Sequence, residues 1–330
     1  AANVASLGFD VPSLVASNRL KLESCQIRPA EIVMAGAFDL EALFVRLEAA
    51  VDQVGAKRVV LDTIEVLLGA FQDEAVVRGE LARLFDWLKQ RDLTTVITGE
   101  RGRQGELTRF GIEEYVSDCV IVLDQRIQEE VSTRRLRLVK YRGSAHGTNE
   151  YPFLITDRGF AVLPITVIGL SYGASEERIS TGVEGLDQML GGGIFRGSTL
   201  LVTGTAGTGK TTLIGHLVAA ACRRGEKALL VSFEESPVQL ARNLRSVGID
   251  LQPFLDAGLL QIWAERASAQ GLEEHLGRLE RLLDDFQPSV AALDSMASLI
   301  HVGSDRQVTT TVEREIDLMK SRGIAAVLTG

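Results

Sequence analysis

A short stretch in the second half of the chain has several glycines and threonines directly before a lysine, Lys210. From Gly204 to Thr211 the residues read G-T-A-G-T-G-K-T, which matches the pattern G-x-x-x-x-G-K-[ST] of loops that hold nucleoside triphosphates. The glycines allow the backbone to turn successive N–H groups toward phosphate oxygens. Lys210 would then reach the β- and γ-phosphates, and the Thr211 hydroxyl would bind Mg²⁺. The predicted phosphate-binding residues are Gly204, Thr205, Ala206, Gly207, Thr208, Gly209, Lys210, Thr211 and Thr212.

The residues on either side of this loop agree with the interpretation. An apolar run over 199–203 is typical of a buried parallel strand. Residues 213–218 continue as a helix whose positive end would face the phosphates. The alternative is a glycine-rich turn that matches the pattern by chance, and the strand and helix context argues against it.

Acidic residues end two further apolar runs. Asp294 closes the run from Ser289, where nucleotide-hydrolysing enzymes carry an acid that orders Mg²⁺, although an aspartate at a strand end is more often a cap or turn residue. Glu234 and Glu235 close the run 228–233, where a carboxylate could polarise an attacking water or hydroxyl. Adjacent strand residues point to opposite faces, so only one glutamate should face the γ-phosphate, and we expect Glu234. The alternative reading is a pair of acids that favours a helix start.

The two halves of the chain repeat one plan. Asp62 and Asp294 end equivalent apolar runs and lie 232 residues apart, which is 294 minus 62. Gly99 and Gly330 end the next equivalent runs at an offset of 231, which is 330 minus 99. A unit of this length indicates a domain duplicated in tandem. Within each unit helical periodicity alternates with short runs rich in Val, Leu and Ile, which predicts an α/β fold with a mostly parallel sheet flanked by helices.

The periodicity also predicts individual elements. We expect helices over 39–54, 74–91, 272–286 and 308–322, and strands over 58–62, 94–98, 199–203, 227–233, 289–294 and 324–328. Ser236 and Pro237 predict a further helix start, because serine caps a helix and proline suits its first turn. The runs 118–123, 134–141 and 151–156 look like paired antiparallel strands. The predicted domains are 1–163 and 178–330, joined by a linker over 164–177.

The predicted ribbon of strands carries a cluster of polar and basic residues. Lys140, Arg142, Ser144 and His146 follow one another at a spacing of two, which puts them on one face if the chain stays extended. One interpretation is a solvated basic strand. The other is a finger that faces phosphate, because a hydroxyl and an imidazole are mixed with the cations around Gly143. The spacing alone does not decide between them.

Composition restricts the class of protein. The chain has 330 residues, of which 45% are hydrophobic, and a net charge of −9, which argues against DNA binding as its main task. The sequence shows no apolar run of membrane-spanning length and no signal peptide, and Cys25, Cys119 and Cys222 lack metal-ligand spacing, so we expect a cytoplasmic protein. The chain opens on what resembles a helix end capped by Gly8, without an initiator Met, and stops on an apolar strand. We therefore expect a piece of a longer protein.

A longer stretch ahead of the loop carries a family resemblance. Residues 178–193 read R-I-S-T-G-V-E-G-L-D-Q-M-L-G-G-G, and residues 233–236 read F-E-E-S. Together with the tandem duplication, they resemble the KaiC family, the double-domain RecA-like ATPases of the cyanobacterial circadian clock. The run K-Y-R-G-S-A-H from Lys140, followed by E-Y-P-F from Glu150, looks like that family's finger.

The resemblance implies a RecA-like fold and a hexameric double ring of identical subunits that bind ATP and Mg²⁺ between them. It implies slow ATP hydrolysis in the first domain and, in the second, phosphorylation of the protein's own Ser/Thr residues and its reversal. Regulators of the KaiB type, with or without those of the KaiA type, would be partners. Glu234 would be the general base and would lie near Mg²⁺ with Thr211. Val247 stands where the family has an aromatic residue against the nucleotide.

The resemblance also carries nucleotide contacts into the first domain. Ser6 matches a contact within the same subunit. The residues that match the finger toward the neighbouring subunit's ATP are Lys140, Tyr141, Arg142, Ser144, His146, Thr156 and Asp157. The first domain's own phosphate loop would precede Ala1, and the phosphoacceptor segment would follow Gly330.

Two other functions fit parts of the sequence. A strand-exchange protein of the RecA or RadA type would use the same fold to bind DNA, but it predicts basic loops, and the acidic charge and the glutamate pair favour the KaiC type. A nucleotide-gated scaffold would use ATP to hold an assembly together with little turnover. A turnover assay separates that function from an active enzyme.

Overall fold

The structure is a computed structural model that describes residues 2–24, 41–68, 74–102, 107, 116–128, 131–163 and 173–330. Cys25 and most of the predicted linker lie outside the described residues. The chain divides into two compact units. The first contains Ala1–Leu123, Leu136–Glu150 and Ile155–Ala161, and the second contains Asp124–Arg135, Tyr151–Leu154 and Val162–Gly330.

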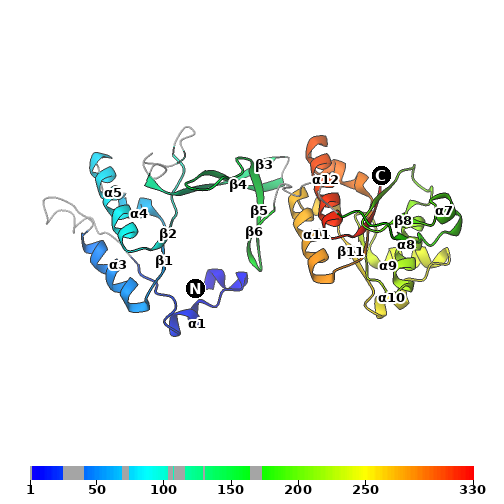
Figure 1. Cartoon of the computed structure of the whole chain (residues 1–330), viewed down its shortest axis with the longest axis horizontal. Coiled ribbons are helices and arrows are strands. Elements are labelled where there is room, and N and C mark those ends of the chain that lie inside the picture. Colours follow the sequence, from blue (N-terminus) through cyan, green and yellow to red (C-terminus); the bar gives the residue numbers. More distant parts are fainter. Residues whose placement is uncertain are drawn as a thin grey trace. The chain divides into compact units, whose positions relative to one another are not determined.

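Five parallel strands form the centre of the second unit (Figure 1). Their order is β11-β10-β12-β13-β9, and the three inner strands β10, β12 and β13 consist entirely of buried residues. Burial on both faces explains why these strands appear in the sequence as continuous apolar runs. Because the strands are parallel, the loops that follow them share one edge of the sheet. The strands are β9 (Thr199–Val202), β10 (Ala228–Ser232), β11 (Leu260–Ala264), β12 (Val290–Asp294) and β13 (Ala325–Thr329).

Helices pack on both faces of this sheet (Figure 1). One face meets α8 (Lys210–Arg223), α9 (Pro237–Ser246) and α10 (Gln252–Asp256). The other meets α11 (Leu272–Phe286), α12 (Asp305–Ser321) and the 3-10 helix η4 (Met296–His301), while η3 (Ala267–Ala269) leads into α11. The signature segment forms β7 (Arg178–Ile179), α7 (Glu184–Met189) and β8 (Ile194–Phe195), with β7 and β8 antiparallel.

The helix ends follow from capping residues. The predicted start at Ser236 is confirmed: its hydroxyl accepts a hydrogen bond from the Gln239 N–H, and the Gln239 side chain accepts one from the Ser236 N–H. Ser304 and Gln307 form the same reciprocal cap on α12. That cap explains why α12 begins three residues before the predicted helix at 308, because a capping box satisfies N–H groups ahead of the apolar pattern.

In the first unit, a parallel pair of strands, β1 (Arg58–Leu61) and β2 (Thr94–Ile97), is covered on one face by helices. Those helices are α3 (Glu41–Val54), α4 (Ile64–Leu68) and α5 (Glu74–Gln90), and Ile64, Leu81 and Leu84 lie fully buried among them. On the other face Val60 and Val96 are 65% and 55% exposed. The unit also contains η1 (Ala2–Leu7), which ends at Gly8 as predicted, and α1 (Val11–Ala16).

The predicted ribbon is a four-stranded sheet in the order β3-β4-β5-β6. Its strands are β3 (Cys119–Gln128), β4 (Val131–Tyr141), β5 (Glu150–Thr156) and β6 (Gly159–Val162), of which β6 was not predicted. Within the described parts of the chain, no helix combines the length and the apolar character that crossing a bilayer requires.

Candidate functional site

The predicted phosphate loop joins the end of β9 to the first residue of α8. A Cβ atom on Gly204 would lie 2.7 Å from the Thr208 Oγ1, so this position tolerates only glycine without a shift. Thr208 Oγ1 donates to the Thr205 carbonyl at 2.9 Å and closes the loop on itself. Lys210 Nζ folds back over the loop and donates to the Gly204 carbonyl at 2.5 Å. The lysine cation and the start of α8 therefore lie on the same loop, as binding of an anion would require.

Asp294, at the end of β12, contacts the start of α8. Its Oδ2 accepts a hydrogen bond from Thr211 Oγ1 at 2.7 Å, and its Oδ1 accepts one from Thr329 Oγ1 at 2.5 Å. The carboxylate is 9% exposed, and Thr329 is fully buried. The structure thus brings together Thr211 and Asp294, which the sequence separates by 83 residues.

The two adjacent glutamates at the end of β10 point to different partners. Glu234 Oε1 accepts a hydrogen bond from Ser298 Oγ at 2.9 Å, and Ser298 lies on η4, just after Asp294. Glu235 Oε2 accepts instead from Asn243 Nδ2 on α9 at 2.9 Å. A backbone hydrogen bond from Phe233 N to the Asp294 carbonyl, at 2.7 Å, holds the ends of β10 and β12 together. Of the two carboxylates, Glu234 is the one that turns toward the segment following Asp294.

These groups fit a nucleotide with its metal ion. A hydroxyl and a carboxylate within hydrogen-bond distance are hard oxygen donors of the kind that Mg²⁺ prefers when it binds through a few protein groups and phosphates. The lysine Nζ already lies on two carbonyl oxygens, Gly204 and Thr205, which a phosphate could replace as acceptor. No cluster of three or more His, Cys, Asp or Glu residues capable of holding a metal by itself exists among the described residues. A metal here would therefore depend on phosphate oxygens for part of its coordination.

The signature segment ahead of the loop serves a structural role around the far end of α8. Asp187 accepts hydrogen bonds from Ser180 Oγ, from Thr181 Oγ1 and from the Thr181 N–H. Partial burial raises the pKa of Asp187, but these hydrogen bonds outweigh burial and hold the pKa below its ordinary value. Arg178 donates to the Leu190 and Gly193 carbonyls and lies 3.9 Å above the Phe195 ring centroid.

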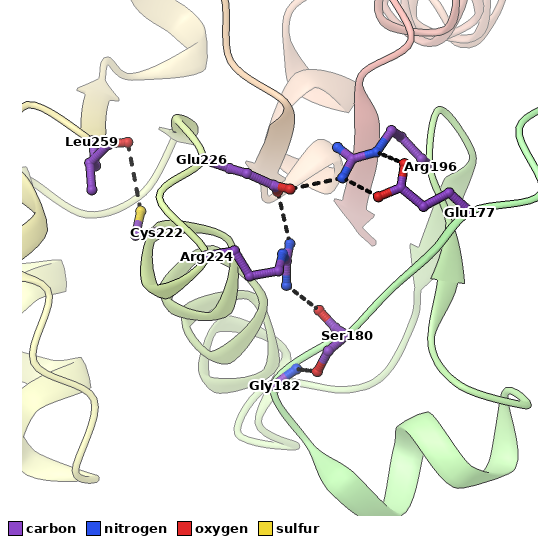
Figure 2. Close-up of polar contacts among 8 residues, drawn as sticks. All are labelled: Glu177, Ser180, Gly182, Arg196, Cys222, Arg224, Glu226 and Leu259. Atoms are coloured by element: carbon purple, nitrogen blue, oxygen red, sulfur yellow. Dashed lines mark hydrogen bonds and ion pairs between the residues drawn. The ribbon is translucent and has the colours of Figure 1, made fainter.

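A chain of charged groups continues from this segment to the end of α8 (Figure 2). Arg196 binds both Glu177 and Glu226, and Glu226 also accepts from Arg224, which donates to the Ser180 carbonyl at 3.2 Å. Burial raises the pKa of Glu226, but the guanidinium groups of Arg224 and Arg196 lower it by more. The pKa of Glu226 therefore lies below its ordinary value. Because Arg224 is the C-cap of α8, this network fixes the helix that carries Lys210 from its opposite end.

The predicted finger residues of the first unit do not lie on one extended face. Strand β4 ends at Tyr141, which is 48% exposed, and Gly143 with a φ of +76° turns the chain directly afterwards. The expected alternation therefore stops at Lys140 and Tyr141, and the turn contains Arg142, whose guanidinium contacts the Asp118 carboxylate at 3.2 Å. His146 Nδ1 lies 3.4 Å from the Ser144 carbonyl, a local contact within the same loop. The chain is therefore not extended from Lys140 to His146, because Gly143 turns the backbone after β4.

Two other segments carried over from the resemblance approach each other, because the residue after η1 lies against Asp157. A Cβ on Gly8, two residues after Ser6, would lie 3.2 Å from the Asp157 carbonyl. Thr156 Oγ1 donates to the Gly159 carbonyl and accepts from the Arg158 N–H, so its hydroxyl closes the β5–β6 turn. The described contacts of Thr156 are thus those of a turn residue, while its predicted nucleotide contact stays a prediction.

Three polar residues at this edge escaped prediction. Ser298, Thr329 and Asn243 each hydrogen-bond to an acidic residue of the candidate site. No motif marks them, because each is separated from its partner along the chain and meets it only through the sheet order. For Thr329 the sequence does offer a signal, because a Thr-Gly pair ends the equivalent runs of both units, at Thr98 and at Thr329.

The sequence also matches known proteins. The family model described as "ATPase: KaiC" matches residues 1–167 and again 179–330. The chain is 51% identical over 328 residues to "Circadian clock protein KaiC2" of Synechocystis sp., which covers 99% of this chain and 58% of that protein. It is 39% identical over 298 residues to "Circadian clock oscillator protein KaiC" of Acaryochloris marina and equally to that of Synechococcus elongatus, in both cases covering 90% of this chain and 57% of the relative.

The chain therefore spans a little over half the length of these curated relatives. Two tandem matches to one family model agree with the duplication of the units. In each unit a threonine hydroxyl donates to the strand-end aspartate, Thr98 to Asp62 and Thr329 to Asp294. With its parallel sheet flanked by helices in the RecA-like manner, the chain belongs to the KaiC family of ATPases.

Proposed function

We propose that the edge formed by residues 204–212, Asp294 and Glu234 binds ATP with Mg²⁺ and hydrolyses it. The observation that carries this proposal is the contact of Thr211 Oγ1 with Asp294 Oδ2 at 2.7 Å, beside a loop whose lysine lies on loop carbonyls. In nucleotide-hydrolysing proteins of this loop type, the hydroxyl after the lysine and a strand-end aspartate hold the metal ion.

Each residue has a role in phosphoryl transfer. The N–H groups of the loop and the start of α8 bind the phosphates, and Lys210 exchanges the Gly204 carbonyl for the β- and γ-phosphates. When bound, Mg²⁺ would neutralise phosphate charge and polarise the γ-phosphoryl group. Thr211 and Asp294 would hold that ion, and Glu234 would accept a proton from the water that attacks the γ-phosphorus as ADP leaves. Glu235 is less suited to this role because its carboxylate is bound to Asn243 on α9.

The assembly and the wider activity are also proposals. We infer two tandem domains, 1–163 and 178–330 with a linker over 164–177, in a hexameric double ring with ATP between subunits. The finger residues (Lys140, Tyr141, Arg142, Ser144, His146) would then reach a neighbour's ATP, with Thr156 and Asp157 at the next turn and Ser6 as a contact within one subunit. The names of the relatives, which are clock proteins, support a clock or signalling role.

By the same reasoning we propose that the second domain phosphorylates the protein's own Ser/Thr residues and removes those phosphates. Regulators of the KaiB type, with or without those of the KaiA type, would be its partners, and the cytoplasm would be its compartment. The acidic net charge of −9 and the family match weigh against a DNA-recombination function.

Three variants of the intact protein test the site. Lys210→Ala should abolish ATP binding here, because it removes the cation that would meet the β- and γ-phosphates, and calorimetry would reveal one site lost. Glu234→Gln should keep ATP binding and lose γ-phosphate transfer at this site, while Glu235→Gln should keep both. An unchanged ATP affinity in Lys210→Ala would contradict the assignment of residues 204–212 as a phosphate loop. Loss of γ-phosphate transfer only in Glu235→Gln would mean that Glu235 is the base. Binding without turnover in the parent would favour the scaffold function.

A further inference from the structure

Glu234 is held by a hydroxyl that the family pattern did not single out. Ser298 Oγ donates to Glu234 Oε1 at 2.9 Å. Within the described part of the chain, Glu234 Oε2 receives no hydrogen bond. Glu234 is exposed at the end of β10, so its side chain would otherwise exchange between rotamers. One carboxylate oxygen is therefore anchored while the other remains available to accept a proton.

The hydroxyl itself sits on a rigid element. Ser298 belongs to η4, whose neighbours Met296 and Leu299 are 7% and 0% exposed in the core beneath the sheet. Its N–H donates to the Ser295 carbonyl at 3.2 Å, and Ser295 directly follows Asp294. Ser298 is thus held in place relative to the end of β12. Its hydrogen bond in turn holds the side chain of Glu234, which follows β10.

The duplicated unit shows that the fold does not require serine here. At the 232-residue offset between Asp62 and Asp294, the counterpart of Ser298 is Val66, which lies on α4 in the same place after its aspartate and is 58% exposed. Met296 likewise corresponds to Ile64, which is fully buried. A side chain without a donor is therefore compatible with this local structure, and the hydroxyl of Ser298 is a feature of the second unit's chemistry.

We propose that Ser298 is a positioning residue for ATP hydrolysis at this site, which holds Glu234 in the rotamer from which it can activate water. This inference rests on the proposed function of Glu234. A carboxylate free to rotate would spend part of its time turned away from the water, and only aligned geometry lowers the barrier. Loss of one such hydrogen bond should slow turnover roughly five- to tenfold.

The test compares three variants at Ser298 with the intact parent by steady-state ATP hydrolysis. The rate that remains in Lys210→Ala is subtracted as the contribution of everything outside this site. Ser298→Ala should lower kcat roughly five- to tenfold and leave KM within about twofold, because the bond acts on the base and not on the nucleotide. Ser298→Thr should restore most of the rate, since it returns the hydroxyl. Ser298→Val mimics the counterpart Val66 and should fold normally while matching Ser298→Ala.

A double-mutant cycle separates this role from a general structural one. In the Glu234→Gln background, adding Ser298→Ala should cause no further loss, because the group it positions has gone. The matched control is Ser321→Ala at the end of α12, directly before β13 and so at the opposite edge of the sheet, and it should leave kcat unchanged. An unchanged kcat in Ser298→Ala, or a full further loss in the Gln background, overturns the inference while leaving the proposed function intact. Unchanged hydrolysis in Glu234→Gln alone overturns the proposed function and this inference with it.

Discussion

A carboxylic acid buried in the core of the second unit should make its stability depend strongly on pH. Glu315 on α12 is 1% exposed, and its Oε2 has no hydrogen-bond partner among the described residues. At the 231-residue offset its counterpart on α5 is Leu84, which is fully buried in the core of the first unit. The second unit thus places an acid where its duplicate places a leucine. We predict that Glu315→Gln stabilises the second unit at neutral pH.

The magnitude follows from the pKa. Burial raises the pKa of Glu315 from its ordinary 4.5 to about 8. The folded state therefore prefers the protonated acid, so the stability it contributes is fully present below pH 4.5 and is lost as the pH rises toward 8. At about 1.4 kcal/mol per pH unit, the loss between the acid limit and pH 7 is about 3 kcal/mol. Glutamine keeps the shape and does not titrate, so the advantage of the variant should grow with pH by this amount.

The assay is urea unfolding of parent and variant between pH 5 and pH 8. Trp263 lies in the second unit, and a Trp87→Phe background leaves it as the only tryptophan. The difference in unfolding free energy between Glu315→Gln and its parent should widen by about 3 kcal/mol over this range. Glu313→Gln, an exposed neighbour on the same helix, is the control and should give a flat difference. A flat difference for Glu315→Gln as well would refute the buried acid.

Two further predictions concern the candidate site and the assembly. Thr329→Val removes the donor to Asp294 Oδ1 at nearly constant shape, so the second unit should lose about 1–3 kcal/mol of unfolding free energy. The exposed Thr309→Val serves as its control, and equal urea midpoints for the two variants would contradict the role of Thr329. Arg142→Ala should leave the subunit folded but raise the ATP concentration needed for ring formation, because a finger in trans is part of the subunit interface. Light scattering with and without ATP measures this, and rings formed at the parent's ATP concentration would leave the finger an ordinary solvated turn.

The sequence predicted the elements wherever periodicity was strong. Strand β12 was expected over 289–294 and runs over Val290–Asp294, and α11 was expected and found over 272–286. These elements are buried on at least one face, so their apolar spacing is dictated by packing. Strand β11 (Leu260–Ala264) was missed because it alternates only weakly and ends the strand order that the described residues form.

The candidate site was predictable only in part. The loop at 204–211 could be predicted because its glycines and Lys210 are adjacent in sequence, and the local backbone determines their geometry. The partners of the acids could not, because Ser298 lies 64 residues from Glu234 and meets it only when β10 and β12 pair. The spacing of the finger residues could not show whether the chain stays extended, because Gly143 turns it directly after β4.

Comparison of the two units distinguishes side chains that the shared fold uses from side chains that serve the candidate site. In both, a threonine at the end of the neighbouring strand donates to the strand-end aspartate at 2.5 Å: Thr98 to Asp62 and Thr329 to Asp294. This pair is common to both copies, so it belongs to the duplicated scaffold. Ser298, in contrast, has Val66 as its counterpart. Both residues lie on a helix that begins two residues after the aspartate, so this local structure does not require the hydroxyl, and the contact of Ser298 with Glu234 gives it a chemical reason.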